Sequence, residues 1–498
     1  MAVFVSAVRR IRTGLAFALA PMLMLAVIAM MGTPVHAATK LLQLSSDPYT
    51  NSTSQHATEV EPDTYSFGST IVSAVQVGRF FGGGSSNIGF ATSTDGGKSW
   101  THGFLPGTTV FATPAGIYAR TSDPSVAFDA AHNVWMISYL GLFPSGNTVE
   151  VDVLVSRSTD GGLTWGMPVA VSVTGAFNDK NWSVCDDTAT SPFYGHCYTE
   201  FDVPTHNDLI EMSTSTDGGE TWGAAISTPD NAHGIGGQPL VQPSGKVIVP
   251  INGFASKGGS LMAFTSGDGG ASLSKALIIT HIDFAPIPGN IRAGTLISAE
   301  IDGAGTVYVA WSDCRFEVKC ATNDLVISTT SDGVNWSPPA RVPIDPIASG
   351  VDHFLPGLGV DKATSAGGAH LGLVYYFYPT SNCTTSTCQL DVGFISSVNG
   401  GATWSTRQVI AGPMSLTWLA NTSQGLMVGD YMSTSFVGGV AFPALVSANA
   451  PSGGVFDEAL FTVMGGFSVT GGNNNGRGDA VMVSPDQAPA YTAPLTNQ

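Results

Sequence analysis

Two segments of the sequence place a glutamate upstream of an Arg-Phe pair. Glu61 precedes VQVGRF, which ends in Arg79 and its phenylalanine, and Glu300 precedes WSDCRF, which contains Arg315. Ionisable side chains in closely packed strands are costly unless they are paired or reach water. A guanidinium group also offers two parallel hydrogen bonds to a carboxylate. The two Glu/Arg sets therefore indicate either ion pairs that line a polar channel or a site that recognises an anion.

The two glutamates differ from their counterparts in the other segments of the chain. When the segments are aligned on the turn that follows the first expected strand, Glu61 and Glu300 stand two residues before that turn. Other segments have Ala127, Val241 or Gly359 at this position. We therefore expect the two Glu/Arg sets to occupy equivalent places.

Other polar side chains stand where an expected strand begins or ends on the same face as these arginines. We expect Arg292 to converge with Arg79 and Arg315 on an acidic group, since each guanidinium can bind a carboxylate. The remaining polar candidates on that face are His56, Glu59, Asp123, Asp179, Lys180, Glu200, Asp202, His233, Gln238, Asp352, His353, Asp430 and Tyr431.

A repeated phrase identifies the elements that must position these residues. STDGGKSW at 93–100 returns as STDGGLTW at 158–165 and STDGGETW at 215–222, with looser copies beginning at 266, 330 and 397. Around the second copy, DPSVAFD, VWMISYLGLF, VEVDVLVSRS and TWGMPVAVS read as four strands, which places the phrase in the turn between strands three and four. In such a turn Asp bonds to nearby backbone, Gly adopts positive φ and Trp packs back on the sheet.

Four-stranded units about 60 residues apart predict an all-β fold, a β-propeller. A last segment, VGDYMSTSF, VAFPALVSA and DEALFTVMG, lacks the phrase and predicts a seventh blade, closed by a strand such as residues 40–45. A six-bladed propeller with that segment as an appendage is the alternative. Ligands of propellers usually bind on the face with the start of strand one and the end of strand two, where the polar candidates lie.

The phrase S-x-D-G-G-x-x-W resembles the Asp-box, or BNR repeat, of the sialidase (neuraminidase) superfamily, and the resemblance covers roughly residues 56–464. The segments IGFATSTDGGKSW, SDPSVAFD and MVGDY look most similar to secreted bacterial members. The resemblance implies a glycoside hydrolase of the exo-α-sialidase type acting on acidic glycans. In that family three arginines bind the sugar carboxylate, a tyrosine activated by a glutamate is the nucleophile, and an aspartate is the acid/base.

Carried onto this sequence, the resemblance makes Tyr431 the nucleophile, Glu300 its activating partner and Asp123 the acid/base. The implied carboxylate-binding residues are Arg79, Arg292 and Arg315. Their positions on the expected ligand face add Glu61, Asp352 and His353 to the substrate-binding candidates. The sequence also departs from the family, because the Arg-Ile-Pro motif before the first Asp-box is missing and Arg292 precedes Glu300. One alternative is therefore a non-catalytic glycan- or protein-binding propeller.

A second alternative is another glycosidase or a polysaccharide lyase on the same scaffold, since a fold does not fix the reaction. Its carboxylate candidates are Asp123, Glu200, Asp352 and Asp430. We expect no cofactor and no metal, with structural calcium at the Asp-rich turns left open because no EF-hand spacing occurs.

The first 37 residues have the features of a secretory signal peptide. RRIR precedes a long apolar stretch, and Val35-His36-Ala37 forms a small-x-small cleavage site. An uncleaved membrane anchor is the alternative. We therefore expect a secreted protein with a propeller over residues 38–464. The Gly/Asn-rich C-terminal segment, residues 465–498, is expected to close the propeller or pack on it.

Six cysteines fall into close pairs, which an exported chain would oxidise to short-loop disulfides. The expected pairs are Cys185 with Cys197, Cys314 with Cys320, and Cys383 with Cys388. The formal net charge of −18 argues against nucleic acid and anionic membranes as partners. The expected partner is a glycan or glycoconjugate.

Overall fold

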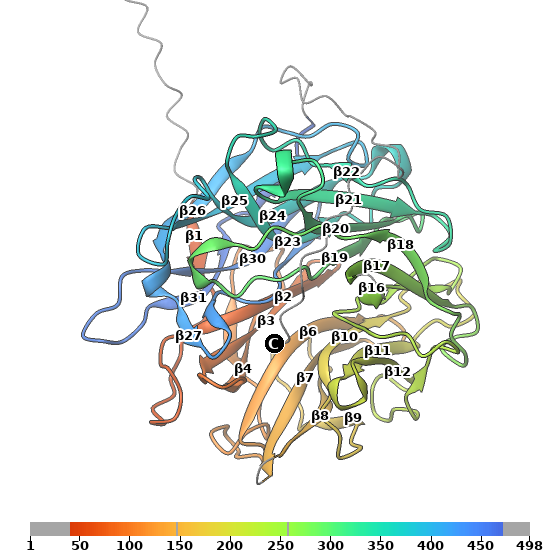
Figure 1. The fold of residues 1–498 in the computed structure, drawn as a ribbon. Coiled ribbons are helices and arrows are strands. Elements are labelled where there is room, and N and C mark those ends of the chain that lie inside the picture. The colour runs from red at the N-terminus through yellow and green to blue at the C-terminus, as the bar shows by residue number, and fades with distance from the viewer. Residues whose placement is uncertain (1–39, 146–147, 256–257, 472–498) are drawn as a thin grey trace, which may run out of the picture. The chain divides into compact units, whose positions relative to one another are not determined.

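The computed structural model describes residues 40–145, 148–255 and 258–471, and the expected signal peptide lies outside these residues. The chain divides into two units, Met1–Ala38 and Thr39–Gln498, and all described residues belong to the second. Apart from short 3-10 turns, the second unit is built from β-strands, as the alternating sequence patterns predict (Figure 1). The 3-10 turns are Pro204–His206, Pro288–Asn290, Val318–Cys320, Ala366–Gly368 and Leu416–Trp418.

Consecutive strands pair antiparallel into sheets of four. One sheet contains β2 (Glu59–Phe67), β3 (Thr70–Arg79), β4 (Ser85–Ser93) and β5 (Thr101–Phe104). The next contains β6 (Arg120–Asp129), β7 (Val134–Ser145), β8 (Thr148–Ser158) and β9 (Val169–Ser172), and a single pair between β4 and β6 joins the two. A further sheet contains β10 (Asp179–Cys185), β11 (Cys197–Val203), β12 (Leu209–Ser215) and β13 (Ile226–Ser227).

The sheets continue in the same manner along the chain. Two short strands, β14 (Gly234–Ile235) and β15 (Leu240–Val241), both pair with β16 (Val247–Ala255), which is followed by β17 (Gly258–Ser266) and β18 (Leu277–His281). Then come β19 (Ser298–Ile301), β20 (Val307–Asp313), β21 (Asp324–Thr330) and β22 (Ala340–Arg341). The following sheet contains β23 (Asp352–Val360), β24 (Leu371–Tyr378), β25 (Gln389–Ser397) and β26 (Gln408–Ser415).

The last sheet combines both ends of the described chain. After a small hairpin of β27 (Ala420–Thr422) and β28 (Gly425–Met427), the strands β29 (Ser433–Val437), β30 (Val440–Ala448) and β31 (Glu458–Val463) pair in order. The early strand β1 (Leu41–Gln43) then pairs antiparallel with β31, and the short β32 (Phe467–Ser468) pairs with β30. The expected closure by a strand within residues 40–45 is therefore confirmed.

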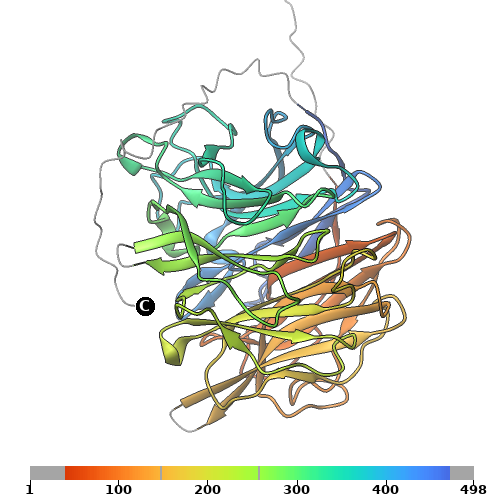
Figure 2. The same ribbon diagram turned by 90° about the vertical axis from the view of Figure 1, so that its right-hand side faces the viewer.

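The first strands of successive sheets lie side by side around one centre. In chain order β2, β6, β10, β15, β19, β23 and β29 each contact the next, and β29 contacts β2 again. Figures 1 and 2 show the remaining strands of each sheet extending outward from this ring. Apolar clusters fill the spaces between neighbouring sheets, as where Trp165 packs on Phe90 with ring centroids 5.7 Å apart. The four-stranded antiparallel sheets are consistent with propeller blades.

The repeated phrase forms a self-contained turn. In the copy between β8 and β9, Asp160 Oδ1 accepts hydrogen bonds from the backbone nitrogens of Leu163 and Thr164, at 3.1 and 2.9 Å. Thr164 Oγ1 donates to the other carboxylate oxygen at 2.5 Å. Gly161 and Gly162 have φ of 84° and 81°, a region that only glycine adopts without strain. The Asp160 carboxylate is thus satisfied within the turn itself.

The three expected disulfides are confirmed: Cys185–Cys197, Cys314–Cys320 and Cys383–Cys388. The first joins β10 to β11, and the second closes the loop between β20 and β21. Each cross-link closes a short loop, so each fixes local geometry more than it constrains the whole unfolded chain.

The repeated turns should depend on hydrogen bonding by the Asp side chain more than on its charge. In the copy at 397–404 the position is Asn399, whose Oδ1 still accepts from Thr403 N at 2.8 Å and whose Nδ2 donates to Thr403 Oγ1. We expect Asp160→Ala to lower the free energy of unfolding by about 1–2 kcal/mol, because two backbone donors lose their acceptor. Asp160→Asn should lose clearly less. Urea denaturation of both variants measures this, and equal losses would contradict the explanation.

Candidate functional site

A β-bulge recurs near the beginning of four first strands. The pairing register shifts at Glu61 in β2, Asp123 in β6, Lys180 in β10 and Leu355 in β23. These residues have φ between 51° and 58°, which is unusual for residues with a side chain. All but Lys180 are followed by proline. A bulge turns one side chain out of the normal alternation, and three of these side chains, Glu61, Asp123 and Lys180, are charged and buried together.

The expected equivalence of Glu61 and Glu300 is wrong. Glu61 lies in the bulge near the beginning of β2, because β2 continues to Phe67 and turns at Gly68, which has φ of 60°. Glu300 lies near the end of β19, just before the turn that leads to β20. The two glutamates therefore face opposite ends of the central channel.

Two arginines lie at the end of the channel where the first strands begin. Arg79, at the end of β3, is 2% exposed and donates to Gly84 O at 2.9 Å. Arg292 binds Asp430 with two parallel hydrogen bonds, the one from Nε to Oδ1 being 2.8 Å long. Gln76 links Arg79 to Glu61, since its amide oxygen accepts from Arg79 and its amide nitrogen donates to Glu61. Among the described residues, Arg79 Nε is buried without a hydrogen-bond partner.

A cavity of about 220 Å³ opens at this end. Its lining brings the predicted residues Arg79, Arg292 and Asp123 together with Asp179 and with Arg120, which the sequence analysis missed. Arg120 packs its guanidinium over a phenylalanine ring at 4.6 Å and donates to a backbone carbonyl of the neighbouring glycine loop. We call this space the arginine cavity. It combines guanidinium groups with carboxyl groups that stand on neighbouring first strands.

Burial sets the protonation of the acids around the arginine cavity. Burial, and then the charge of Asp123, raise the pKa of Asp179 to about 7. Burial and the charges of Asp123 and Asp430 raise the pKa of Glu61 well above its usual range. Burial would also raise the pKa of Asp430, but the ion pair with Arg292 outweighs it and lowers that pKa. The cavity therefore offers proton-holding carboxyl groups beside ionised ones at neutral pH.

Beneath the arginine cavity, Tyr431 and Lys180 fill the centre. Lys180 Nζ lies 3.8 Å from Asp123 Oδ2 and 3.4 Å from the centroid of the Tyr431 ring. Tyr431 is 4% exposed, and its hydroxyl donates to Pro124 O at 2.9 Å. Burial and the charge of Glu61 raise the pKa of Tyr431 well above its usual range. Trp182 meets the Tyr431 ring edge to face, with centroids 5.2 Å apart.

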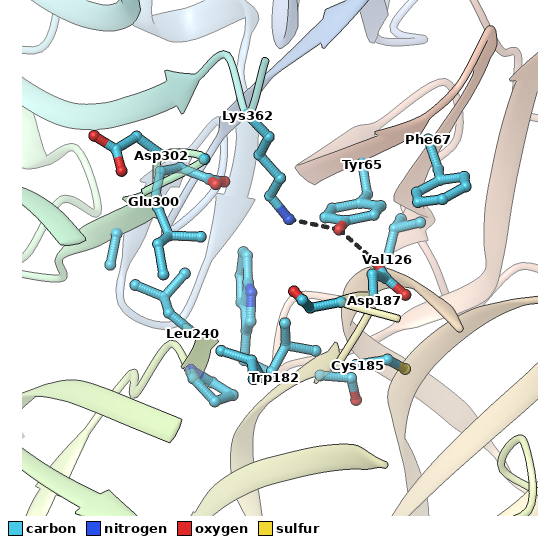
Figure 3. A pocket seen from close by; sticks show the side chains of 18 of the residues that line it. Tyr65, Phe67, Val126, Trp182, Cys185, Asp187, Leu240, Glu300, Asp302 and Lys362 are labelled. Atoms are coloured by element: carbon cyan, nitrogen blue, oxygen red, sulfur yellow. Dashed lines mark hydrogen bonds between the residues drawn. The ribbon is translucent and has the colours of Figure 1, made fainter. Parts of the chain in front are cut away.

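A second cavity, of about 280 Å³, lies at the ends of the first strands. Figure 3 shows Lys362 and Tyr65 reaching into it toward each other, with Asp187 beyond. Lys362 Nζ donates to Tyr65 Oη at 2.6 Å, and Tyr65 Oη donates to Asp187 Oδ2 at 3.1 Å. Glu300 and Trp182 also line this space, which we call the lysine cavity. Burial, opposed by the charge of Lys362, raises the pKa of Glu300 to about 8.

The remaining candidates lie outside both cavities. Arg315 forms an ion pair with Asp313 at 2.6 Å and donates to Thr280, so the structure does not bring it to Arg79, Arg292 or Glu300. Neither of the Glu/Arg ion pairs considered from the sequence occurs among the described residues. Asp352, at the beginning of β23, accepts from Asn323, which precedes β21 in the neighbouring sheet. His353 is buried beside Asp324 and Asp345, the group of side chains that could hold a metal ion.

Comparison with known proteins finds no matching protein-family model. A sialidase from Bacteroides fragilis (strain YCH46) is 24% identical over 288 residues, which cover 52% of this chain and 49% of the relative. The chain thus spans about half the length of this curated relative. No helix in the described ranges is long and apolar enough to cross a membrane.

Solved structures show the same kind of fold at low sequence identity. A polysaccharide lyase described as PL25 ulvan lyase has a TM-score of 0.51 and 10% identity, covering 86% of this chain and 97% of its own. Trypanosoma rangeli sialidase with the inhibitor DANA has a TM-score of 0.42 and 12% identity, covering 72% and 59%. The chain has a sialidase-like β-propeller fold. Identities this low concern the fold alone.

The raised carboxyl pKa values predict that stability falls as the pH rises. Burial raises the pKa of several native carboxyl groups to about 7 or 8, whereas in the unfolded chain they titrate near 4. Between these values the native state holds protons that the unfolded state has released, so the free energy of unfolding decreases with increasing pH. The groups are Glu59, Asp63, Asp179, Asp187 and Glu300.

We therefore expect a lower melting temperature at pH 8 than at pH 5, measured by calorimetry in buffers of equal ionic strength. Glu300→Gln should reduce this slope, because it removes one group that must lose its proton in the folded state. Burial lowers the pKa of His353 to about 4, whereas an unfolded histidine titrates near 6.5. This residue therefore makes stability rise with pH, but only below pH 6.5. A melting temperature that rises between pH 5 and pH 8 would contradict the prediction.

Proposed function

We propose that the chain is a secreted glycoside hydrolase of the sialidase type that binds an acidic glycan in the arginine cavity. The observation that carries the proposal is the convergence of Arg79, Arg120 and Arg292 with Asp123 and Asp179 on one cavity. Guanidinium groups bind carboxylates with paired hydrogen bonds, and a carboxyl group whose pKa is raised to about 7, as at Asp179, suits acid/base chemistry.

We also propose that the propeller has seven blades, with the repeated phrases in the turns between their third and fourth strands. The ring of contacts that runs from β2 through β29 and back supports this count. The closure of the last sheet by β1 supports it too, since propellers join their ends in this way within one blade. The three disulfides support export of the chain.

The substrate in this proposal carries a carboxylate. Among the described residues Arg79 Nε has no hydrogen-bond partner and Arg120 contacts a backbone carbonyl and a ring, so both guanidinium groups can bind a new anionic partner. Arg292 is held in place by Asp430 and adds positive charge. The similarity to a sialidase supports an acidic sugar. The ulvan lyase structure bound to -[GlcA(1-4)Rha3S]- supports the same class of ligand.

The proposed chemistry uses Tyr431 with Glu61, which takes the place that the sequence analysis gave to Glu300. Among the charged groups, Glu61 raises the pKa of Tyr431 most strongly, so in this proposal its ionised form receives the phenol proton and returns it when the glycosyl–tyrosine bond breaks. Tyr431 Oη attacks the anomeric carbon, the glycosidic C–O bond breaks, and the Asp123–Asp179 pair protonates the leaving oxygen. Water then cleaves the glycosyl–tyrosine bond, and the same pair accepts its proton.

A fluorogenic sialoside tests the reaction directly. We expect release of the fluorophore by the wild type and a loss of roughly 100-fold in kcat/KM for Arg79→Met and for Arg292→Met, since each removes a charged contact to the substrate. Arg157→Met is the matched control, because Arg157 pairs with Glu220 beside a repeated turn. It should keep full activity. Arg315→Met should also keep it, and a 100-fold loss there would restore the role first assigned to Arg315.

Asp179→Asn provides a test of the acid. We expect kcat to fall by roughly 100-fold or more, and the alkaline limb of the pH profile near pH 7 to disappear with the lost proton donor. Substrates whose leaving group needs no protonation should be affected least. An unchanged pH profile would exclude Asp179 as the proton donor.

A polysaccharide lyase is the second candidate, favoured by the extent of the structural similarity to the ulvan lyase. A lyase removes the proton at C5 of a uronic acid, breaks the C4–O bond and leaves a C4–C5 double bond. The product absorbs in the ultraviolet, so incubation with a uronic acid polymer separates lyase from hydrolase. Binding of glycans without either product would instead support the non-catalytic alternative.

A further inference from the structure

We propose that Asp324, Asp345 and His353 form a binding site for a divalent transition metal ion of the zinc type. The site lies where β21 begins and where the segment before β23 enters the next sheet. One carboxylate oxygen from each aspartate and one ring nitrogen of the histidine all lie within 4.8 Å of one another. The proposal is independent of the reaction proposed for the arginine cavity.

His353 has the arrangement of a metal ligand. Its side chain is 1% exposed, and its Nδ1 lies 3.4 Å from Asn323 O, which also accepts from the His353 backbone nitrogen at 3.0 Å. With Nδ1–H directed at a carbonyl, the lone pair is on Nε2. Nε2 is buried, has no hydrogen-bond partner in the described part of the chain and lies 3.9 Å from Asp345 Oδ2.

Each aspartate keeps an oxygen for an ion. Arg341 Nη2 binds Oδ1 of Asp324 at 2.7 Å and Oδ1 of Asp345 at 3.0 Å. Asp324 Oδ2 is buried and has no hydrogen-bond partner among the residues that the structure describes. Asp345 Oδ2 accepts from the hydroxyl of Ser349, and it lies 3.9 Å from both His353 Nε2 and Nη1 of the partly exposed Arg407, so an ion would replace Arg407 at this oxygen. Arg341 thus fixes one side of the two carboxylates, and their other oxygens remain on the side of the imidazole.

The charges around the site leave room for a divalent cation. Besides Asp324 and Asp345, the carboxylate of Glu317 acts on this cluster, while Arg341 and Arg407 supply the positive charge. Three carboxylates against two guanidinium groups leave a negative charge in excess.

The surroundings hold the ligands in position. The Cys314–Cys320 disulfide closes the loop that leads to Asn323, and Glu317 in that loop accepts from the backbone nitrogen of Ala348 at 2.9 Å. Asn323 donates twice to Asp352 Oδ1, at 2.9 Å each. Metal-binding histidines are commonly oriented by such outer contacts. A site that is built this way needs little rearrangement when an ion enters.

The donor set selects among metal ions. Imidazole suits zinc and its transition-metal neighbours, whereas Ca²⁺ and Mg²⁺ prefer oxygen donors throughout. Small side-chain rotations would bring each donor atom to about 2.0–2.2 Å from the ion, the distance that zinc requires. Because the ligands come from two neighbouring sheets, the bound ion would link β21 to the beginning of β23 and stabilise the folded chain.

Isothermal titration of the EDTA-treated full chain with ZnCl₂ tests the site. We expect about one high-affinity ion per chain, weak binding of CaCl₂, and a rise in melting temperature with zinc. His353→Gln and Asp324→Asn should each weaken zinc binding by roughly 10-fold or more. His370→Gln is the matched control, since His370 also lies beside an aspartate, Asp361, at 4.0 Å but outside the cluster. It should bind zinc as the wild type does.

Absorption of the Co²⁺-loaded wild type gives a readout that does not depend on variants that fold. We expect visible d–d bands that appear with one equivalent of cobalt and disappear when zinc is added. Failure of the wild type to bind zinc, or binding by His353→Gln equal to that of the wild type, would overturn the proposal.

Discussion

The pairing of β1 with β31 is the contact on which the rest of the structure depends. It completes the last sheet with a strand from the opposite end of the described chain, and so it joins β29 and β2 into a closed ring. In this closed arrangement each first strand packs against the first strands of two neighbouring sheets. It also forces every first strand to present one side to a common centre, whatever side chains stand there.

Folding that centre costs free energy, because the bulges place ionisable side chains in buried positions. Glu61, Asp123 and Lys180 are each buried in a left-handed conformation next to a shift in register. Water is largely excluded, so Glu61 keeps its proton to higher pH, and Lys180 is shared between Asp123 and the Tyr431 ring. Strained and poorly compensated residues persist only where the surrounding structure holds them, and they concentrate at functional sites. The arginine cavity lies directly above these bulges.

The sequence was sufficient to predict the features that depend on local patterns. The repeated phrase and the alternation around it predicted antiparallel four-stranded units, and short spacing predicted the three disulfides. The rule that strand starts share a face predicted that Arg79, Arg292 and Asp123 approach each other. That rule works because it needs only the direction of each strand.

Features that depend on register or on competing partners were not predictable in this way. An extra residue in a bulge shifts the strand register, and this shift cannot be seen in the sequence pattern. The sequence alignment therefore placed Glu61, which lies in a bulge, at the same position as Glu300, which does not. Arg315 binds Asp313, only two residues before it, and this local partner keeps it from the cavity. Arg120, Tyr65 and Lys362 carry no motif. Only the proline after Glu61 and Asp123 signals that their positions correspond.

The stack formed by Lys180, Tyr431 and Trp182 links the arginine cavity to the lysine cavity. Trp182 lines the lysine cavity, Lys180 touches Asp123 of the arginine cavity, and the Tyr431 ring contacts both. These three side chains therefore connect the walls of the two cavities. A substitution in the stack would be felt on both sides, so the two linings cannot change independently at the centre.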